Sequence, residues 1–375
     1  MKAENGRERI LFVGVAASLL AAVLPVPAWA KDFTQRTAAE KRSAEKGLDR
    51  AEVTLLRREP GPGRKDVADK LMARFAKSTD PMATAGSSKR QEKRNRLDVV
   101  ADRWILTVKA DGTQARYRNH AYVESKPDLG KDVSQRFSNE KLEAMGRKFI
   151  EANLADLIKL GEKEELVPYF TEFMIAGGGG TAPNDKPQEE KVLASTVVFT
   201  RAVDKVNVVG PGSKVAITFA NDEKPVAFHY DWPSYKSAGR SQKVAPLDEI
   251  KNRRRKVAKL DPDARDVELK RFDCGYYDAG ALRRDTKAVI QAGCAMQAVK
   301  NQVADEKAHS ADPRSGQVTV AAVDVIPAGE KIEPDSGWPQ AVKMLGGREA
   351  KGKEAPKNPP ATQPKTENAP LLKND

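Results

Sequence analysis

Histidine and cysteine are scarce in this chain, and their scarcity limits the chemistry that it can perform. The 375 residues include three histidines and two cysteines. His120, His229 and His309 stand in no zinc-ligand spacing with one another or with a cysteine, and the sequence has no His-Glu-x-x-His motif. We therefore expect no metal site, and we assign no catalytic and no cofactor-binding residue.

Long apolar runs are also missing, except for one near the amino terminus. It covers residues 10–26, follows a charged start and leads into Ala28-Trp29-Ala30. This pattern is typical of a secretory signal peptide, so we expect cleavage before Lys31 and removal of residues 1–30. An uncleaved anchor is the alternative, but the run is slightly short for a span of roughly 20 residues and two prolines interrupt its end. We expect a periplasmic or extracellular protein with no membrane span after cleavage.

The two cysteines, Cys274 and Cys294, lack the C-x-x-C spacing of redox pairs. In an oxidising compartment an isolated pair is typical of a disulfide rather than of a metal site. Closing a loop of this size stabilises a fold by about 3 kcal/mol in the chain-entropy model. The sequence therefore predicts a structural disulfide.

Aromatic residues make up 6% of the chain and charged residues 31%, with a formal net charge of +12. A basic protein can bind nucleic acid, anionic lipid, cell-wall polymer or an acidic protein. Outside the cytoplasm nucleic acid is not an expected partner. The partner that we expect is a protein or peptide, with a cell-envelope polyanion as the alternative.

Composition divides the rest of the chain into four segments. Residues 31–96 are polar and predict a partly helical or disordered arm, and residues 343–375 predict a disordered tail rich in proline and lysine. Residues 97–233 predict an α+β domain. Residues 234–342 predict a second α+β unit that holds the disulfide.

One amphipathic helix and one alternating sheet are the clearest elements of the first unit. Ser138 is typical of a helix N-cap, and the apolar stripe that follows it predicts a helix as far as Gly161. Residues 213–219 and 226–230 alternate in polarity around the turn Asn221-Asp222. We expect a helix packed on an antiparallel sheet, which is an α+β fold, and a second round of the same kind after Pro233.

The passage from Lys205 to Phe219, KVNVVGPGSKVAITF, with the turn and strand after it, resembles a known family pattern. It is similar to the strand–glycine–strand–turn–strand passage of thermolysin-type propeptides and PepSY domains, and the likeness covers residues 138–232. The resemblance implies a PepSY/cystatin-like fold and a secreted, non-catalytic module that inhibits or chaperones a peptidase. No peptidase motif is present in this sequence, so such a partner would be a separate molecule. The resemblance carries over no functional residue.

Two local clusters form a candidate binding surface. Arg253, Arg254 and Arg255 are a dense basic group in a predicted helix, where a solvated face is the ordinary interpretation and a grip on a polyanion is the functional one. Tyr276 and Tyr277 follow the first cysteine, and aromatic side chains often anchor interfaces. Packing around the disulfide is the alternative explanation of the two tyrosines.

Other motifs predict no chemistry. His229 and Asp231 would share one strand face as a conceivable acid–base pair, but a histidine there is typically just packed or half-exposed. Gly177–Gly180 lacks the Lys-Ser/Thr of a phosphate loop. Gly210-Pro211-Gly212-Ser213 precedes no helix, which a nucleophile elbow requires, so we interpret it as a tight turn.

These patterns favour an exported, non-catalytic binding or regulatory protein that recognises a protein or peptide through a sheet edge and aromatic side chains. Modulation of a peptidase is the activity that the resemblance adds. A basic, envelope-associated structural protein and an enzyme of unrecognised type are the alternatives.

Overall fold

The structure, a computed structural model, describes most of the central part of the chain. The described residues are 48, 50–76, 82, 84, 87–109, 111–124, 130–176, 189–260, 266–280, 288–303, 317–333, 335 and 336. The predicted signal peptide, the glycine run 177–180 and the predicted tail lie outside these residues.

The fold class expected from the sequence is wrong. Strands account for 51% of the described residues and helices for 19%, so the molecule is mainly β rather than an α+β unit of one helix on a sheet. Nor does a second such unit follow the first, because β13, β15 and β16 continue the same sheet. Alternating polarity identifies a strand but not the number of strands that will join it, and this explains the error.

The strands of the amino-terminal half are β1 (Glu52–Arg58), β2 (Lys89–Lys93), β3 (Arg96–Val100), β4 (Trp104–Lys109), β5 (Gln114–Asn119), β6 (Lys131–Asp132), β7 (Glu164–Ala176) and β8 (Lys191–Val203). Those that follow are β9 (Val206–Val209), β10 (Lys214–Ala220), β11 (Pro225–Asp231), β12 (Tyr235–Lys243), β13 (Val267–Tyr277), β14 (Val289–Ile290), β15 (Ala292–Val303) and β16 (Gln317–Pro327). The helices are α2 (Arg64–Phe75), α3 (His120–Glu124), α4 (Asn139–Asn153), α5 (Leu247–Val257) and the 3₁₀ turn η2 (Val133–Gln135).

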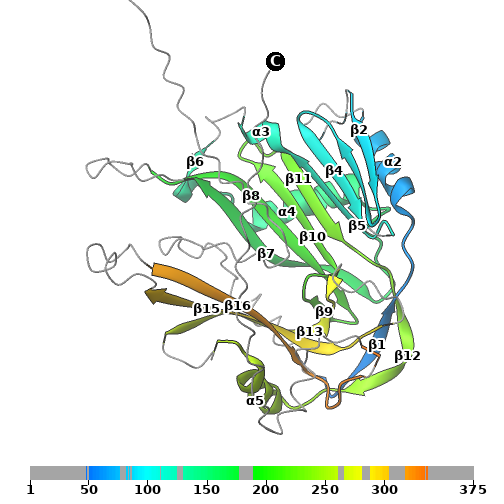
Figure 1. Cartoon of the computed structure of the whole chain (residues 1–375), viewed down its shortest axis with the longest axis vertical. Helices are drawn as coiled ribbons and strands as arrows, with labels where there is room; N and C mark the ends of the chain where they lie inside the picture. Colours follow the sequence, from blue (N-terminus) through cyan, green and yellow to red (C-terminus); the bar gives the residue numbers. More distant parts are fainter. Residues whose placement is uncertain are drawn as a thin grey trace, which may run out of the picture.

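Thirteen strands form one large mixed sheet, whose main path runs β16-β15-β13-β9-β8-β10-β11-β5-β4-β3-β2. β6 and β7 pair with β8 off this path. Figure 1 shows the antiparallel strands β2 to β5 beside β10 and β11, with β13, β15, β16 and α5 at the opposite end of the molecule. A separate three-stranded sheet, β12-β1-β14, flanks that end.

The main hydrophobic core covers one face of the antiparallel strands. Leu71 and Phe75 of α2 and Leu142 and Phe149 of α4 pack there against inward-facing residues of the sheet. The sheet contributes Leu97, Val99, Leu106, Val108, Ala115, Tyr117, Val197, Phe199, Val215, Ile217, Phe219, Phe228 and Tyr230. Along β3, β4, β5, β10 and β11, alternate residues enter this core, as expected for strands with one covered face.

The described part of the predicted arm, 31–96, belongs to the folded body. β1 places Val53 and Leu56 in a second core, and α2 places Val67 and Leu71 in the main one. The segment is rich in charge, but its few apolar residues recur at strand and helix spacing. Burial depends on that spacing rather than on mean polarity.

The second core lies around the disulfide. Val53, Ile250, Met296 and Ile326 from β1, α5, β15 and β16 share it. The two halves of the large sheet meet where β13 pairs in parallel with β9, at Tyr276↔Val208 and Tyr277↔Val209. A β-carbon at Gly275 would lie 1.9 Å from the carbonyl oxygen of Asn207, so only glycine allows this approach.

Candidate binding face

The structure separates the two clusters of the predicted binding surface. Tyr276 is 2% exposed and lies in the second core, where burial raises the pKa of its hydroxyl to about 12. Tyr277 is half-buried, and its ring packs against Gly210. The tyrosines therefore act mainly in packing near the disulfide, and they form no exposed aromatic surface.

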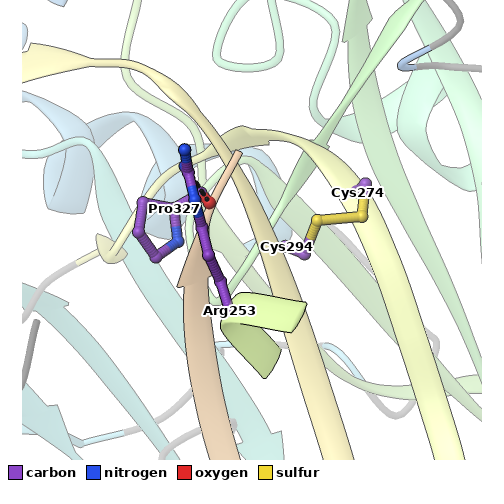
Figure 2. Close-up of a disulfide and its surroundings, with 4 residues drawn as sticks. All are labelled: Arg253, Cys274, Cys294 and Pro327. Carbon is purple, nitrogen blue, oxygen red and sulfur yellow. Dashed lines mark hydrogen bonds between the residues drawn. A yellow bond between two sulfur atoms is a disulfide. The ribbon is translucent and has the colours of Figure 1, made fainter. Parts of the chain in front are cut away.

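The three arginines of α5 also differ in their surroundings. The Arg253 guanidinium donates to the carbonyl oxygen of Pro327 at 3.2 Å (Figure 2) and to that of Gly329 at 2.6 Å, so it ties α5 to the end of β16. Arg254 is 8% exposed and lies over the ring of Phe272. Arg255 is exposed. Two of the three thus hold the fold together, and the three arginines do not form one basic surface.

The disulfide expected from the sequence is present in the structure. Cys274 and Cys294 occupy directly opposite positions on β13 and β15 and are joined (Figure 2). Both are buried in the second core. A disulfide is consistent with a non-cytoplasmic protein. Within the part of the chain that the structure describes, every helix is too short or too polar to cross a bilayer.

A network of buried polar groups joins the two halves behind the turn at Gly210. Arg58 forms an ion pair with Asp278, and the hydroxyl of Tyr235 donates to the same carboxylate. Ser213, whose φ of 51° is unusual outside glycine, lies 2.7 Å from the Tyr235 hydroxyl. The Lys214 ammonium, 1% exposed, donates to Thr200 and to two backbone carbonyls. These groups bond mainly to one another and to nearby backbone carbonyls, as expected for a structural junction.

The face of the antiparallel strands opposite the main core is different, and we call it the open face. It carries alternate residues of β3, β4, β5, β11 and β10, among them Asp98, Val100, Ile105, Thr107, Lys109, Arg116, Arg118, Ala227, His229, Ala216 and Thr218. Gln114, Asp231 and Lys214, at the ends of β5, β11 and β10, belong to the same face and are buried. Most side chains of the open face are partly exposed even though their strands lie in the middle of the sheet. None of them is aromatic. The open face is thus a broad polar surface on a rigid support.

Two neighbouring arginines dominate the charge of the open face. Arg116 and Arg118 alternate on β5, and neither has a hydrogen bond or an ion pair within the described residues. Burial, and then the charge of Arg118, lowers the pKa of Arg116. Two acids of the same face are close to them in the pairing order. Asp98 already pairs with Lys93 at 3.5 Å and with Arg96 at 2.9 Å, and Asp231 lies opposite Lys214. Neither acid forms an ion pair with Arg116 or Arg118 within the described residues.

His229 lies beside them, directly opposite Arg116 in the pairing of β11 with β5. Burial, and then the positive charges of Arg116 and Lys109, lowers the pKa of its imidazole to about 4. The ring is therefore neutral at physiological pH. Its Nε2 atom lies 3.1 Å from the side-chain nitrogen of Gln114. His229 is hydrogen-bonded to Gln114 and not to Asp231, so the acid–base pair suggested by the sequence is not formed.

Sequence reasoning missed the open face. Arg116 and Arg118 are close in sequence, but His229 is more than a hundred residues away and becomes their neighbour only through strand order. The available signal was the i, i+2 spacing of two arginines on one strand. That signal becomes informative only when the other face of the strand is known to be covered.

Comparisons with known proteins provide no functional assignment. No family model matches the chain, and no curated protein matches it significantly. Among solved structures, an uncharacterized protein from Eubacterium rectale is similar over 76% of this chain and 87% of that chain, with 11% sequence identity and a TM-score of 0.42. We base no conclusion on a likeness at this level. The resemblance to PepSY domains stays a prediction.

Proposed function

We propose that this protein is an exported binding protein that holds a macromolecular partner on the open face of its large sheet. The observation that carries the proposal is the contrast in composition between the two faces. One face is fully occupied by a core, and the other presents partly exposed polar side chains across five central strands. Such a face is rigid, broad and partly exposed, and these properties suit a protein partner better than a small molecule.

Export is part of this proposal. The expected signal peptide and the disulfide both support a periplasmic or extracellular site of action. The resemblance to peptidase propeptides adds one class of partner, a secreted peptidase. Mass analysis of the mature protein is expected to show Lys31 as the first residue.

A photo-crosslinking experiment in the producing cell tests the proposal. A crosslinking amino acid at Thr107 or Thr218, both on the open face, is expected to give a discrete adduct with a partner protein. The matched position is Lys148, an exposed residue of α4 on the opposite side of the sheet. Adducts from Lys148 alone, or turnover of a hydrolase substrate by the purified protein, would refute the proposed function.

The positive charge of the open face also favours a second candidate, a structural protein held to an envelope polyanion. In that case the protein would stay on isolated envelopes at low salt and be released at high salt, because exposed charges are screened. Retention that does not change with salt would exclude this candidate.

A further inference from the structure

The pair Arg116 and Arg118 is the most unusual feature of the open face. Like charges placed side by side repel, and a chain that keeps them without a counter-charge loses some stability. Functional sites are where such local conflicts are expected. The conflict would be relieved by a negatively charged group from outside the described chain.

The geometry of β5 sets the spacing of that group. Residues i and i+2 of a strand are roughly 6.8 Å apart and point to the same side. An extended peptide has the same repeat, so acidic side chains at alternate positions of such a peptide match the two arginines in register. An arginine guanidinium binds a carboxylate with two parallel hydrogen bonds, which makes the match directional.

The other charged side chains of the open face do not neutralise Arg116 and Arg118. Lys109 extends the positive charge onto β4. Three acids belong to the same face. Asp98 already has two basic partners, and Asp231 lies opposite Lys214. Glu172 is on β7, four strands from Arg118, which is roughly 19 Å at the usual strand spacing. None of these carboxylates is placed to neutralise both arginines.

The neutral and apolar residues of the open face narrow the class of ligand. Single-stranded nucleic acid is typically held by aromatic side chains on which its bases stack, and the open face has none. Ile105, Ala227 and the methyl groups of Thr107 and Thr218 lie among the charges instead. These side chains can contact the small residues between the acids of a peptide.

We propose that Arg116 and Arg118 bind an extended acidic peptide segment whose carboxylates occupy alternate positions. This inference rests on the proposed function and names the chemistry of the partner. The peptide would lie along β5 on the open face, with one carboxylate on each guanidinium. His229, opposite Arg116, would border the site as a neutral side chain.

Binding of synthetic peptides to the full chain tests this proposal. The probe is a short end-capped peptide in which glutamate alternates with threonine, and its isomer has the same composition with the glutamates three residues apart. We expect the alternating peptide to bind the wild-type protein more tightly than the isomer does. Arg116→Gln together with Arg118→Gln is expected to weaken its binding about tenfold for each arginine.

Matched variants separate a specific site from net charge. Lys148→Gln together with Lys251→Gln removes two positive charges from exposed positions on α4 and α5 and is expected to leave binding of the alternating peptide unchanged. Replacing both arginines by lysine keeps the charge but loses the two-pronged geometry, so partial binding is expected. Circular dichroism and thermal unfolding of each variant verify that it is folded.

Three results would overturn the acidic-peptide proposal. The first is equal affinity for the two peptide isomers. The second is a loss of affinity in the Lys148→Gln, Lys251→Gln variant as large as that in the double arginine variant. The third is unchanged affinity in the double arginine variant. Equal binding of polyphosphate or a uronic-acid polymer at physiological salt would show a general polyanion site instead. If the peptide fails while crosslinks from Thr107 persist, the ligand class is wrong and the proposed function stands.

Discussion

The two faces of the large sheet are built from the same strands, yet they carry opposite chemistry. On β5, Ala115 and Tyr117 are fully buried, whereas Arg116 and Arg118 between and after them are partly exposed. On β11 the same alternation places Phe228 in the core and His229 on the open face. Under the proposed function, stability and recognition depend on alternate residues, and each should change with little effect on the other.

The largest effect is expected on the covered face. Phe228 is 2% exposed, and its ring centroid lies 6.0 Å from those of Phe75 and Tyr117. Phe228→Ala is expected to lower the free energy of unfolding by about 3–5 kcal/mol, because it leaves a cavity in an aromatic core. Urea denaturation measures this change. In the same assay Arg118→Ala is expected to change the free energy of unfolding by no more than about 0.5 kcal/mol. Similar losses in both variants would contradict the division between the faces.

A smaller loss is expected where a helix rests on the covered face. A β-carbon at Gly146 of α4 would lie 2.6 Å from the ring of Phe199 and 2.7 Å from Val197. Gly146→Ala is therefore expected to destabilise the protein by about 1–3 kcal/mol through overpacking. Helix propensity alone predicts a gain of about 1 kcal/mol, so the sign of the change in thermal unfolding decides between the two.

An effect of pH is expected from the open face. The pKa of His229 is about 4 in the folded protein and 6.5 in an unfolded chain. Between these values the unfolded state binds more protons, so stability falls as pH is lowered from 6.5 towards 4. His229→Gln removes this contribution, and the difference in stability between wild type and variant should change over that window. If the stabilities of wild type and variant change in parallel with pH, the imidazole titrates normally in the folded protein.

The smallest effect is expected at the arginine pair. Arg116→Gln removes a charge that repels Arg118 and has no partner within the described residues, so stability should stay constant or rise by up to about 0.5 kcal/mol. The gain should fade at high salt because the repulsion is screened. A clear loss would mean that Arg116 is structural, and the separation of roles between the faces would need revision.

Sequence reasoning succeeded where the signal was local. Ser138 caps α4 by accepting a hydrogen bond from the backbone of Lys141, as its position before an apolar stripe predicts. Asp111-Gly112, a dipeptide typical of a hairpin turn, joins β4 to β5, and Gly112 has a φ of 90°. Such features depend on a few consecutive residues, so they can be read without a structure.

Long-range pairing could not be predicted in this way. Glu52 of β1 pairs with Lys243 of β12, almost two hundred residues later, and β9 meets β13 in parallel. Polarity assigns each residue to a face but leaves the neighbouring strand undetermined. The fold class and the candidate site both depend on those neighbours, so both were beyond the sequence patterns.

The contact between Gly275 and the carbonyl of Asn207 has a consequence for how this protein can diverge. Exposed positions of a fold are generally only weakly constrained by stability. Position 275 admits only glycine as long as the two ends of the molecule share one hydrogen-bonded ladder. Homologues that replace this glycine should therefore have two independent sheets, whatever they bind.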